Sequence, residues 1–377
     1  MSAIEIVKVT DKKGLKQFID FNHQLYKKSP YAAPEIREDM LYTLDPKQNE
    51  AFEFCDCECY LAKRDGKVVG RVAAIINRKA NQKWDVKVVR FGWIDFIDDA
   101  EVARKLLEQV EAFGRAHGME KIQGPLGFTD FDPEGTLIEG FDELDTMGTL
   151  YNYDYYPRIF EQLGFEKAVD WVEQIIKMPT HIPEKHKRVA ELISKRYNLT
   201  VRSLRNKKDV QEFGPKIFGI INQAYSKLFG YSEMSARQAA HYISEYLPSI
   251  DLNMVCIIQE ADTGELVATA ISMPSMTRAL QRAHGRLFPL GWIHMLDALH
   301  WHRPEIVDLM LIAVRPDHQN RGLNALLFSH LIPIYQQMGF KYAVVYPQLE
   351  TNSRGVGLWD DLSPRTHRRR RCYTKPL

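Results

Sequence analysis

The sequence has few cysteines, no long apolar run and almost no net charge. Five cysteines in 377 residues are too few for a disulfide framework, which indicates a reducing compartment. Met1 to Gly14 contain no apolar signal core, and no run of about 18 apolar residues occurs, so nothing predicts secretion or a membrane span. Lys+Arg number 50 and Asp+Glu 49, without the basic excess of a nucleic-acid-binding protein. We therefore expect a soluble cytoplasmic protein with no nucleic-acid partner.

What is present predicts two globular domains with the same order of elements. The composition is 45% hydrophobic and 26% charged, and the length suits two domains. The segment CYLAKRDGKVVGRVAAII in the first half matches VCIIQEADTGELVATAIS in the second, and each reads as a β-hairpin around a glycine-containing turn. In both halves a strand, an amphipathic helix and another strand follow. An internal duplication explains this pattern, with domains at 1–180 and 181–377 and a linker at Met178–Lys187.

The segment that most clearly indicates a ligand-binding site is Val307–Ile332, VDLMLIAVRPDHQNRGLNALLFSHLI. An apolar strand runs into a turn and then into an apolar helix. The first amides of that helix have no internal partner, and the helix dipole adds positive potential, so this turn can bind an anion such as a pyrophosphate. Gly322 allows close approach of the backbone, and Arg321 adds a cation.

This segment resembles the cofactor motif of the GCN5-related N-acetyltransferase (GNAT) superfamily, Gln/Arg-x-x-Gly-x-Gly/Ala. Gln319 and Gly322 match the motif, whereas Asn324 departs from its final Gly/Ala. The resemblance implies that acyl-CoA or acetyl-CoA, or an acyl carrier protein, is the donor and that no metal takes part. It implies that the phosphates and the pantetheine arm are held by Ile312, Ala313, Val314, Gln319, Asn320, Arg321, Gly322, Leu323, Asn324 and Ala325.

A second motif of the superfamily, Asn-x-x-Ala-x-x-Leu-Tyr, has a partial match after the last strand of this pattern. Asn352 and Leu358 match it, and the resemblance implies that Asn352 contacts the cofactor region. Trp359 stands where the family has a tyrosine that protonates the leaving thiolate, and an indole N–H is not a useful acid. The group that deprotonates the amine is open, and the polar candidates near the expected site are Asp308, Glu350 and Tyr346. The bland alternative for the two carboxylates is a solvated strand end.

The first half lacks the cofactor turn. Its matching segment, Gly92–Ala103, has no glycine in the turn and carries Asp95, Asp98 and Asp99, which would repel a pyrophosphate. The resemblance implies an α/β fold of two tandem GNAT-like domains, each a mixed, mostly antiparallel sheet flanked by helices. We interpret 1–180 as a degenerate GNAT-like domain without a cofactor loop, and 181–377 as the acyltransferase domain.

The second half carries a helical insertion at about 275–305. Arg278, Arg282 and Arg286 recur every four residues and form a basic stripe if the segment is one helix, beside apolar residues such as Trp292 and Leu296. This pattern is typical of an interfacial membrane helix, which predicts peripheral contact with the inner face of the membrane. The alternatives are a wall of an acyl-chain channel and an ordinary solvated helix. The basic tail Arg368–Arg371 is expected in a solvated final strand.

Over nearly the whole chain the sequence resembles the YghO-like proteins, a family that includes bacterial ceramide synthases. The resemblance lies in SPYAAPEIREDM, IQGPLGFTDFDPEGTLIEGFD and LETNSRGVGLWDDLSPRTHRRRRCYTKPL. It implies an N-acyltransferase that moves an acyl group from a thioester to a primary amine, with a sphinganine-type lipid amine as acceptor. The alternatives are a tandem GNAT-fold aminoacyltransferase that uses aminoacyl-tRNA, and a non-catalytic binding module. The oligomeric state is left open by the sequence.

Overall fold

The computed structural model describes residues 2–182, 184–246 and 250–377, which form two units. The first unit comprises Met1–Val172, Met276–Met295 and His367–Leu377; the second comprises Glu173–Ser275 and Leu296–Thr366. Segments 276–295 and 367–377 lie in the first unit of this division. The predicted domain boundary at 180/181 stays a prediction.

The first unit is a mixed sheet with helices on its faces. Its strands are β1 (Glu5–Lys8), β2 (Cys55–Arg64), β3 (Lys67–Asn77), β4 (Val88–Phe96), β5 (Lys121–Gly124), β6 (Thr136–Glu139), the start of β7 (Glu166–Lys177) and most of β13 (Arg365–Pro376). Its helices are α1 (Lys12–Leu25), α2 (Arg37–Thr43), α3 (Arg78–Trp84), α4 (Ala100–Ala116), α5 (Tyr155–Gln162), α9 (Thr277–Ala283) and most of α10 (Trp292–Leu296). The strand order is β1-β2-β3-β4-β5-β13-β7, with β6 on β13, and β4 and β5 pair in parallel.

The second unit repeats this plan. Its strands are the end of β7, β8 (Leu199–Ser203), β9 (Val255–Glu260), β10 (Leu266–Pro274), β11 (Ile306–Val314) and β12 (Tyr342–Leu349). Its helices are α6 (Glu184–Arg196), α7 (Lys207–Tyr225), α8 (Ala236–Tyr246), α11 (Leu323–Gln337) and α12 (Ser353–Val356), with short turns of helix at η3 (Leu252–Met254), η4 (Asp297–Trp301), η5 (Pro316–His318) and η6 (Gly357–Leu362). The strand order is β7-β12-β11-β10-β9-β8, and β11 and β12 pair in parallel.

Local sequence signals explain why these elements form. The Asp65-Gly66 turn has positive φ at both residues, which is the geometry that a tight hairpin requires. Asp99 caps α4 through the amide of Glu101, and the predicted apolar stripe of that helix, including Val102 and Leu106, is buried against the sheet. In the second unit the apolar residues of α11 share a core with β9, β10, β11 and β12 in the same way. The predicted linker differs, because α6 begins at Glu184, inside Met178–Lys187.

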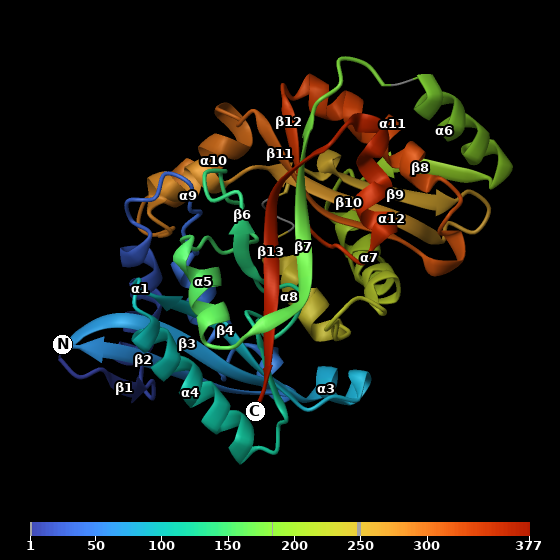
Figure 1. Cartoon of the computed structure of the whole chain (residues 1–377). Helices are drawn as coiled ribbons and strands as arrows, with labels where there is room; N and C mark the ends of the chain where they lie inside the picture. The colour runs from blue at the N-terminus through green and yellow to red at the C-terminus, as the bar shows by residue number, and fades with distance from the viewer. Residues whose placement is uncertain (1, 183, 247–249) are drawn as a thin grey trace. The chain divides into compact units, whose positions relative to one another are not determined.

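Each unit is completed by a strand from the other half of the sequence. Strand β13, the last of the chain, pairs with β5 through Tyr373–Gly124 and lies beside β7 (Figure 1). Strand β7 begins in the first unit, and its last residues lie beside β12 in the second (Figure 1). The two halves of the sequence therefore exchange their final strands.

The basic tail is not a solvated strand, which corrects the prediction. The side chains of Arg368 and Arg370 are fully buried, because β13 is an interior strand of the first unit. Both guanidinium groups donate to Asp145 Oδ1, at 2.7 and 2.8 Å, and this buried carboxylate supplies the opposite charge that buried arginines need.

The predicted insertion is also not one helix. Helix α9 ends at Ala283, and His284 follows with φ of 52°, so Arg286 does not share a helix with Arg278 and Arg282. Helix α10 has only five residues. Across the part of the chain that the structure describes, no helix has the length and apolarity that crossing a bilayer requires.

Candidate functional site

Strands β11 and β12 diverge halfway along the second unit. Their parallel pairing runs from Ile306–Tyr342 to Leu309–Val345 and ends there, although β11 continues to Val314 and β12 to Leu349. At the same point the pairing of β10 with β11 shifts by one residue, so Met310 is bulged out. A bulge bends a strand and re-aims its edge. The last residues of β11 therefore have an edge that β12 does not cover.

Two side chains donate to carbonyl groups on this part of β11. Tyr225 of α7 donates its hydroxyl to the carbonyl of Ile312 at 3.0 Å, and Gln319 donates its side-chain amide to the carbonyl of Val314 at 3.1 Å. Carbonyl groups two residues apart point to the same side of a strand. The predicted pantetheine contacts are Ile312, Ala313 and Val314. They lie on a strand edge where two carbonyl groups already accept hydrogen bonds from side chains.

The turn after β11 leads to an uncapped helix. Asn320 and Gly322 both have positive φ, at 62° and 79°, and Gly322 begins α11 without a side-chain cap. A Cβ at Gly322 would lie 2.7 Å from Ile193 Cδ1 of α6, so both φ and packing require glycine here. The guanidinium of Arg321 lies over the ring of Tyr197, 5.0 Å from its centre. The first amides of α11, at Leu323 and Asn324, are thus unblocked by any cap, while Ala325 bonds back to the carbonyl of Gly322.

The predicted polar candidates separate into two groups. Asp308 is buried on β11, and Tyr346 of β12 donates to its Oδ2 at 3.5 Å, so the structure brings these two together. Glu350 is half-buried in the turn that follows β12. Asn352 caps α12, where its side-chain oxygen accepts from the amide of Gly355 at 3.2 Å. The catalytic and binding roles of all four residues stay predictions.

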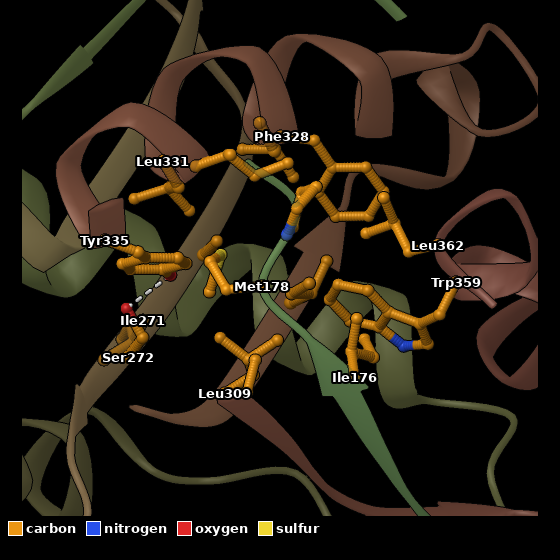
Figure 2. Close-up of a pocket in the computed structure, with 16 residues that line it drawn as sticks. Ile176, Met178, Ile271, Ser272, Leu309, Phe328, Leu331, Tyr335, Trp359 and Leu362 are labelled. Atoms are coloured by element: carbon orange, nitrogen blue, oxygen red, sulfur yellow. Dashed lines mark hydrogen bonds between the residues drawn. The ribbon is translucent and has the colours of Figure 1, made fainter. Parts of the chain in front are cut away.

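An apolar pocket lies between α11 and strands β10 to β12 (Figure 2). Its walls are almost entirely aliphatic or aromatic, and Met178 and Pro179 of the chain after β7 also line it. The polar pair in its lining is satisfied internally: Tyr335 donates to Ser272 Oγ at 2.7 Å, and Ser272 donates to the carbonyl of Met254 at 3.0 Å. An apolar ligand can therefore enter without leaving these two hydroxyls unpaired.

Trp359 closes one side of this pocket. Its ring is buried and stacks on Phe328, with centres 4.9 Å apart. Its indole Nε1–H is buried and has no hydrogen-bond partner among the described residues. A buried donor without a partner is costly, so a ligand acceptor at this position would be favoured. Trp359, which stands where the family has a tyrosine, thus lines the pocket and keeps an indole N–H available to a ligand acceptor.

The sequence analysis missed Tyr225. Burial raises the pKa of Tyr225 from 10.0 to about 12, so the hydroxyl keeps its proton at neutral pH. It is the side chain that donates to the carbonyl of Ile312, on the open edge of β11. No sequence signal marks it, because α7 precedes β11 by more than eighty positions and only the fold joins them.

The matching place in the first unit is filled by the chain itself. The parallel pairing of β4 and β5 ends at Arg90–Gln123, and the amide of Leu126 then donates to the carbonyl of Phe91 at 3.0 Å. Farther along β4, Tyr155 donates to the carbonyl of Phe96 at 2.6 Å. The start of α4 is capped by the carboxylate of Asp99. No equivalent of the open edge of β11 is therefore left here within residues 88–126.

Comparison with known proteins agrees with this architecture. No family model matches the chain. The chain is 25% identical over 374 residues to protein YghO of Escherichia coli K12, covering 97% of this chain and 94% of that protein. It is 24% identical over 383 residues to the bacterial ceramide synthase of Caulobacter vibrioides, covering 99% and 98%.

Solved structures show the same fold. A tandem GNAT protein from the clavulanic acid biosynthesis pathway superposes with a TM-score of 0.59 at 10% identity, covering 99% of this chain and 98% of that one. The GCN5-related glucosamine N-acetyltransferase region of a fungal β-N-acetylglucosaminidase gives a TM-score of 0.57 at 12% identity, covering 100% of this chain and 38% of that one. The chain therefore has the tandem GNAT fold and is homologous over nearly its full length to YghO and bacterial ceramide synthase.

Proposed function

We propose that the chain is an N-acyltransferase that transfers an acyl group from a thioester, either acyl-CoA or an acylated carrier protein, to a primary amine. The observation that carries this proposal is the divergence of β11 and β12 beside the uncapped start of α11. An open strand edge and a helix N-terminus together suit a ligand with an amide-containing arm and a phosphate group.

In this proposal the donor lies along β11. The amides of Leu323 and Asn324, with the positive end of the α11 dipole, take the pyrophosphate or the carrier phosphate, and Arg321 adds a cation. The pantetheine amides bond to the edge of Ile312–Val314 in place of side-chain donors such as Gln319. The thioester carbonyl then lies near the place where β11 and β12 part.

The chemistry follows from the groups around that place. The neutral amine attacks the thioester carbonyl, a C–N bond forms, and the C–S bond breaks. Asp308, buried and bonded to Tyr346, takes the proton that the amine loses, directly or through Tyr346 and water. The thiolate leaves and takes a proton from solvent, because burial makes Tyr225 a weaker acid than a thiol and its hydroxyl donates to the carbonyl of Ile312. Trp359 holds the donor through its indole N–H and supplies no proton.

The apolar pocket favours a fatty acyl group over acetyl. Its free volume of about 30 Å³ is too small for a fatty chain in this arrangement of side chains. A long chain therefore enters only when flexible side chains such as Met178 move aside. The homology to a bacterial ceramide synthase supports a sphinganine-type lipid amine as acceptor, met at the cytoplasmic face of a membrane.

The test is calorimetric titration with acetyl-CoA and palmitoyl-CoA, followed by release of free thiol in the presence of sphinganine or ethanolamine. We expect palmitoyl-CoA to bind more tightly and sphinganine to release thiol. Asp308→Asn should abolish turnover while donor binding persists, and a Leu192→Ser variant, changed at an exposed position of α6, should match the wild type.

Other outcomes point elsewhere. A preference for acetyl-CoA would remove the lipid part of the proposal and keep the acyl transfer. Turnover only with an acylated carrier protein would change the donor. Salt-sensitive binding of aminoacyl-tRNA would favour the aminoacyltransferase, and no binding of any thioester would favour the non-catalytic module.

A further inference from the structure

A short loop of the first unit exposes four large apolar side chains. We define this loop as Leu287–Ile293, which includes the first two residues of α10; Phe288 is 70% exposed and Leu290 is 65% exposed, and Trp292 and Ile293 are also exposed. Apolar side chains on a protein surface are commonly scattered singly. Four within six residues form a concentrated apolar tip.

The base of this loop is fixed. Gln281 of α9 donates its side-chain amide to the carbonyls of Pro30 and Ala32, at 3.1 and 2.8 Å. The amide of Arg37 donates to the carbonyl of Gly285 at 2.9 Å, and the amide of Leu287 donates to Glu38 Oε2 at 3.3 Å. The segment is therefore held on the first unit just before its apolar tip, from Gln281 to Leu287.

Several donors of the tip are satisfied within the tip itself. The amide of Trp292 donates to the carbonyl of Leu287 at 2.9 Å, and its indole Nε1–H donates to the carbonyl of Pro289 at 3.0 Å. The amide of Ile293 donates to the carbonyl of Leu290 at 3.1 Å, and Pro289 has no amide hydrogen. The loop closes so tightly that a Cβ at Gly291 would lie 1.8 Å from the carbonyl oxygen of Arg286. These donors need no water when the tip leaves the aqueous phase.

The segment that carries the tip is itself positively charged, and the carboxylates in contact with it include Asp20 and Glu38 of the first unit. Residues 276–295 include Arg278, Arg282 and Arg286 and contain no aspartate or glutamate. Arg286 is well exposed, and its distance of 3.9 Å from Asp20 makes only a weak ion pair. Cations that flank exposed aromatic and aliphatic side chains complement an anionic lipid surface.

We propose that the loop Leu287–Ile293 is a membrane-docking element, which inserts Phe288, Leu290, Trp292 and Ile293 into the headgroup region of an anionic bilayer. Arg278, Arg282 and Arg286 stay at the level of the phosphates. This surface is separate from the apolar pocket of the second unit, and docking requires no turnover, so the proposal stands independently of the proposed activity.

The test is co-sedimentation of the full chain with vesicles of phosphatidylcholine alone and of phosphatidylcholine mixed with phosphatidylglycerol. We expect binding to the mixed vesicles that weakens as salt is raised. The double variant Phe288→Ser/Leu290→Ser should lose about tenfold or more of that binding, since each buried methylene adds to membrane affinity. Leu192→Ser is the matched control, because Leu192 is an exposed leucine (62%) on another helix.

Two further measurements complete the test. Arg282→Gln/Arg286→Gln should weaken binding to the mixed vesicles and leave any binding to pure phosphatidylcholine unchanged. Circular dichroism shows that each variant is folded. The proposal is overturned if the wild type does not sediment with anionic vesicles, or if the Phe288→Ser/Leu290→Ser variant binds as well as Leu192→Ser. A wild-type dimer that this double variant dissociates, without vesicle binding, would instead assign the tip to a second copy of the chain.

Discussion

The proposed donor site depends on a negative charge meeting the start of α11, and Asn324→Asp tests this directly. Asn324 is the second residue of the helix and is half-buried. Aspartate has the same shape, so the change adds one charge and almost nothing else. Gly322→Asp would be a poorer probe, because its Cβ would clash with Ile193 and its φ of 79° is strained for any side chain.

The expected effects on folding and on binding have opposite signs. A carboxylate in the first turn of a helix stabilises it by about 0.3–1 kcal/mol, so the melting temperature should stay the same or rise. A pyrophosphate with about two negative charges at roughly 6 Å, in an effective dielectric of about 60, would be repelled by about 2 kcal/mol. That corresponds to roughly 20- to 30-fold weaker donor binding.

The assay is titration with palmitoyl-CoA at low and high salt, with thermal melting of the same samples. The loss should shrink as salt screens the repulsion. Asn206→Asp is the matched control, since Asn206 caps α7 in the same unit and lies outside the proposed site. The reasoning fails if Asn324→Asp binds the donor like the wild type at low salt, or if Asn206→Asp loses as much.

Three further predictions concern single side chains. Trp359→Phe keeps the stacking on Phe328 and removes the indole N–H, so KM for the donor should rise about fivefold while the free energy of unfolding stays unchanged. An unchanged KM would show that the N–H does not bind the donor. Tyr225→Phe leaves the carbonyl of Ile312 open to an amide of the donor, so donor binding should tighten about threefold while kcat in thiol-release assays stays the same, and weaker binding would contradict this. Burial, then Arg71 and Arg286, lowers the pKa of His23 from 6.5 to about 4, so the unfolded state takes up the proton first as pH falls. The contribution of His23 to the free energy of unfolding, at most about 3 kcal/mol, is present above pH 6.5 and is lost as the pH falls towards 4. The free energy of unfolding in urea should therefore fall less between pH 7 and 4.5 in His23→Gln than in the wild type. Parallel curves of this free energy against pH would contradict the prediction.

Short-range signals made much of the fold predictable. The Asp65-Gly66 hairpin and the apolar stripe of α4 depend on neighbours a few residues away, and both are confirmed. The turn before α11 was recognisable for the same reason, because glycine spacing and an apolar helix are local features. The repetition of such features predicted two similar domains, and the resemblance of Val307–Ile332 to the GNAT cofactor motif implied the tandem GNAT fold.

Long-range partners were not predictable. Arg368 and Arg370 were predicted to be solvent-exposed, because no neighbouring residue in the sequence indicates a counter-ion. Their counter-ion, Asp145, lies more than 220 positions earlier in the chain. Tyr225 meets Ile312 only through the packing of α7 on the sheet. The stripe predicted for the insertion is wrong for a local reason, since a left-handed residue at His284 ends α9 before Arg286.

The exchange of final strands also bears on the history of such a chain. After a duplication, two independent copies can drift apart or be separated by a break in the gene. Once β13 completes the first unit and the end of β7 completes the second, each unit loses its final strand when the other half of the sequence is lost. Selection on either unit therefore favours keeping both halves in one polypeptide.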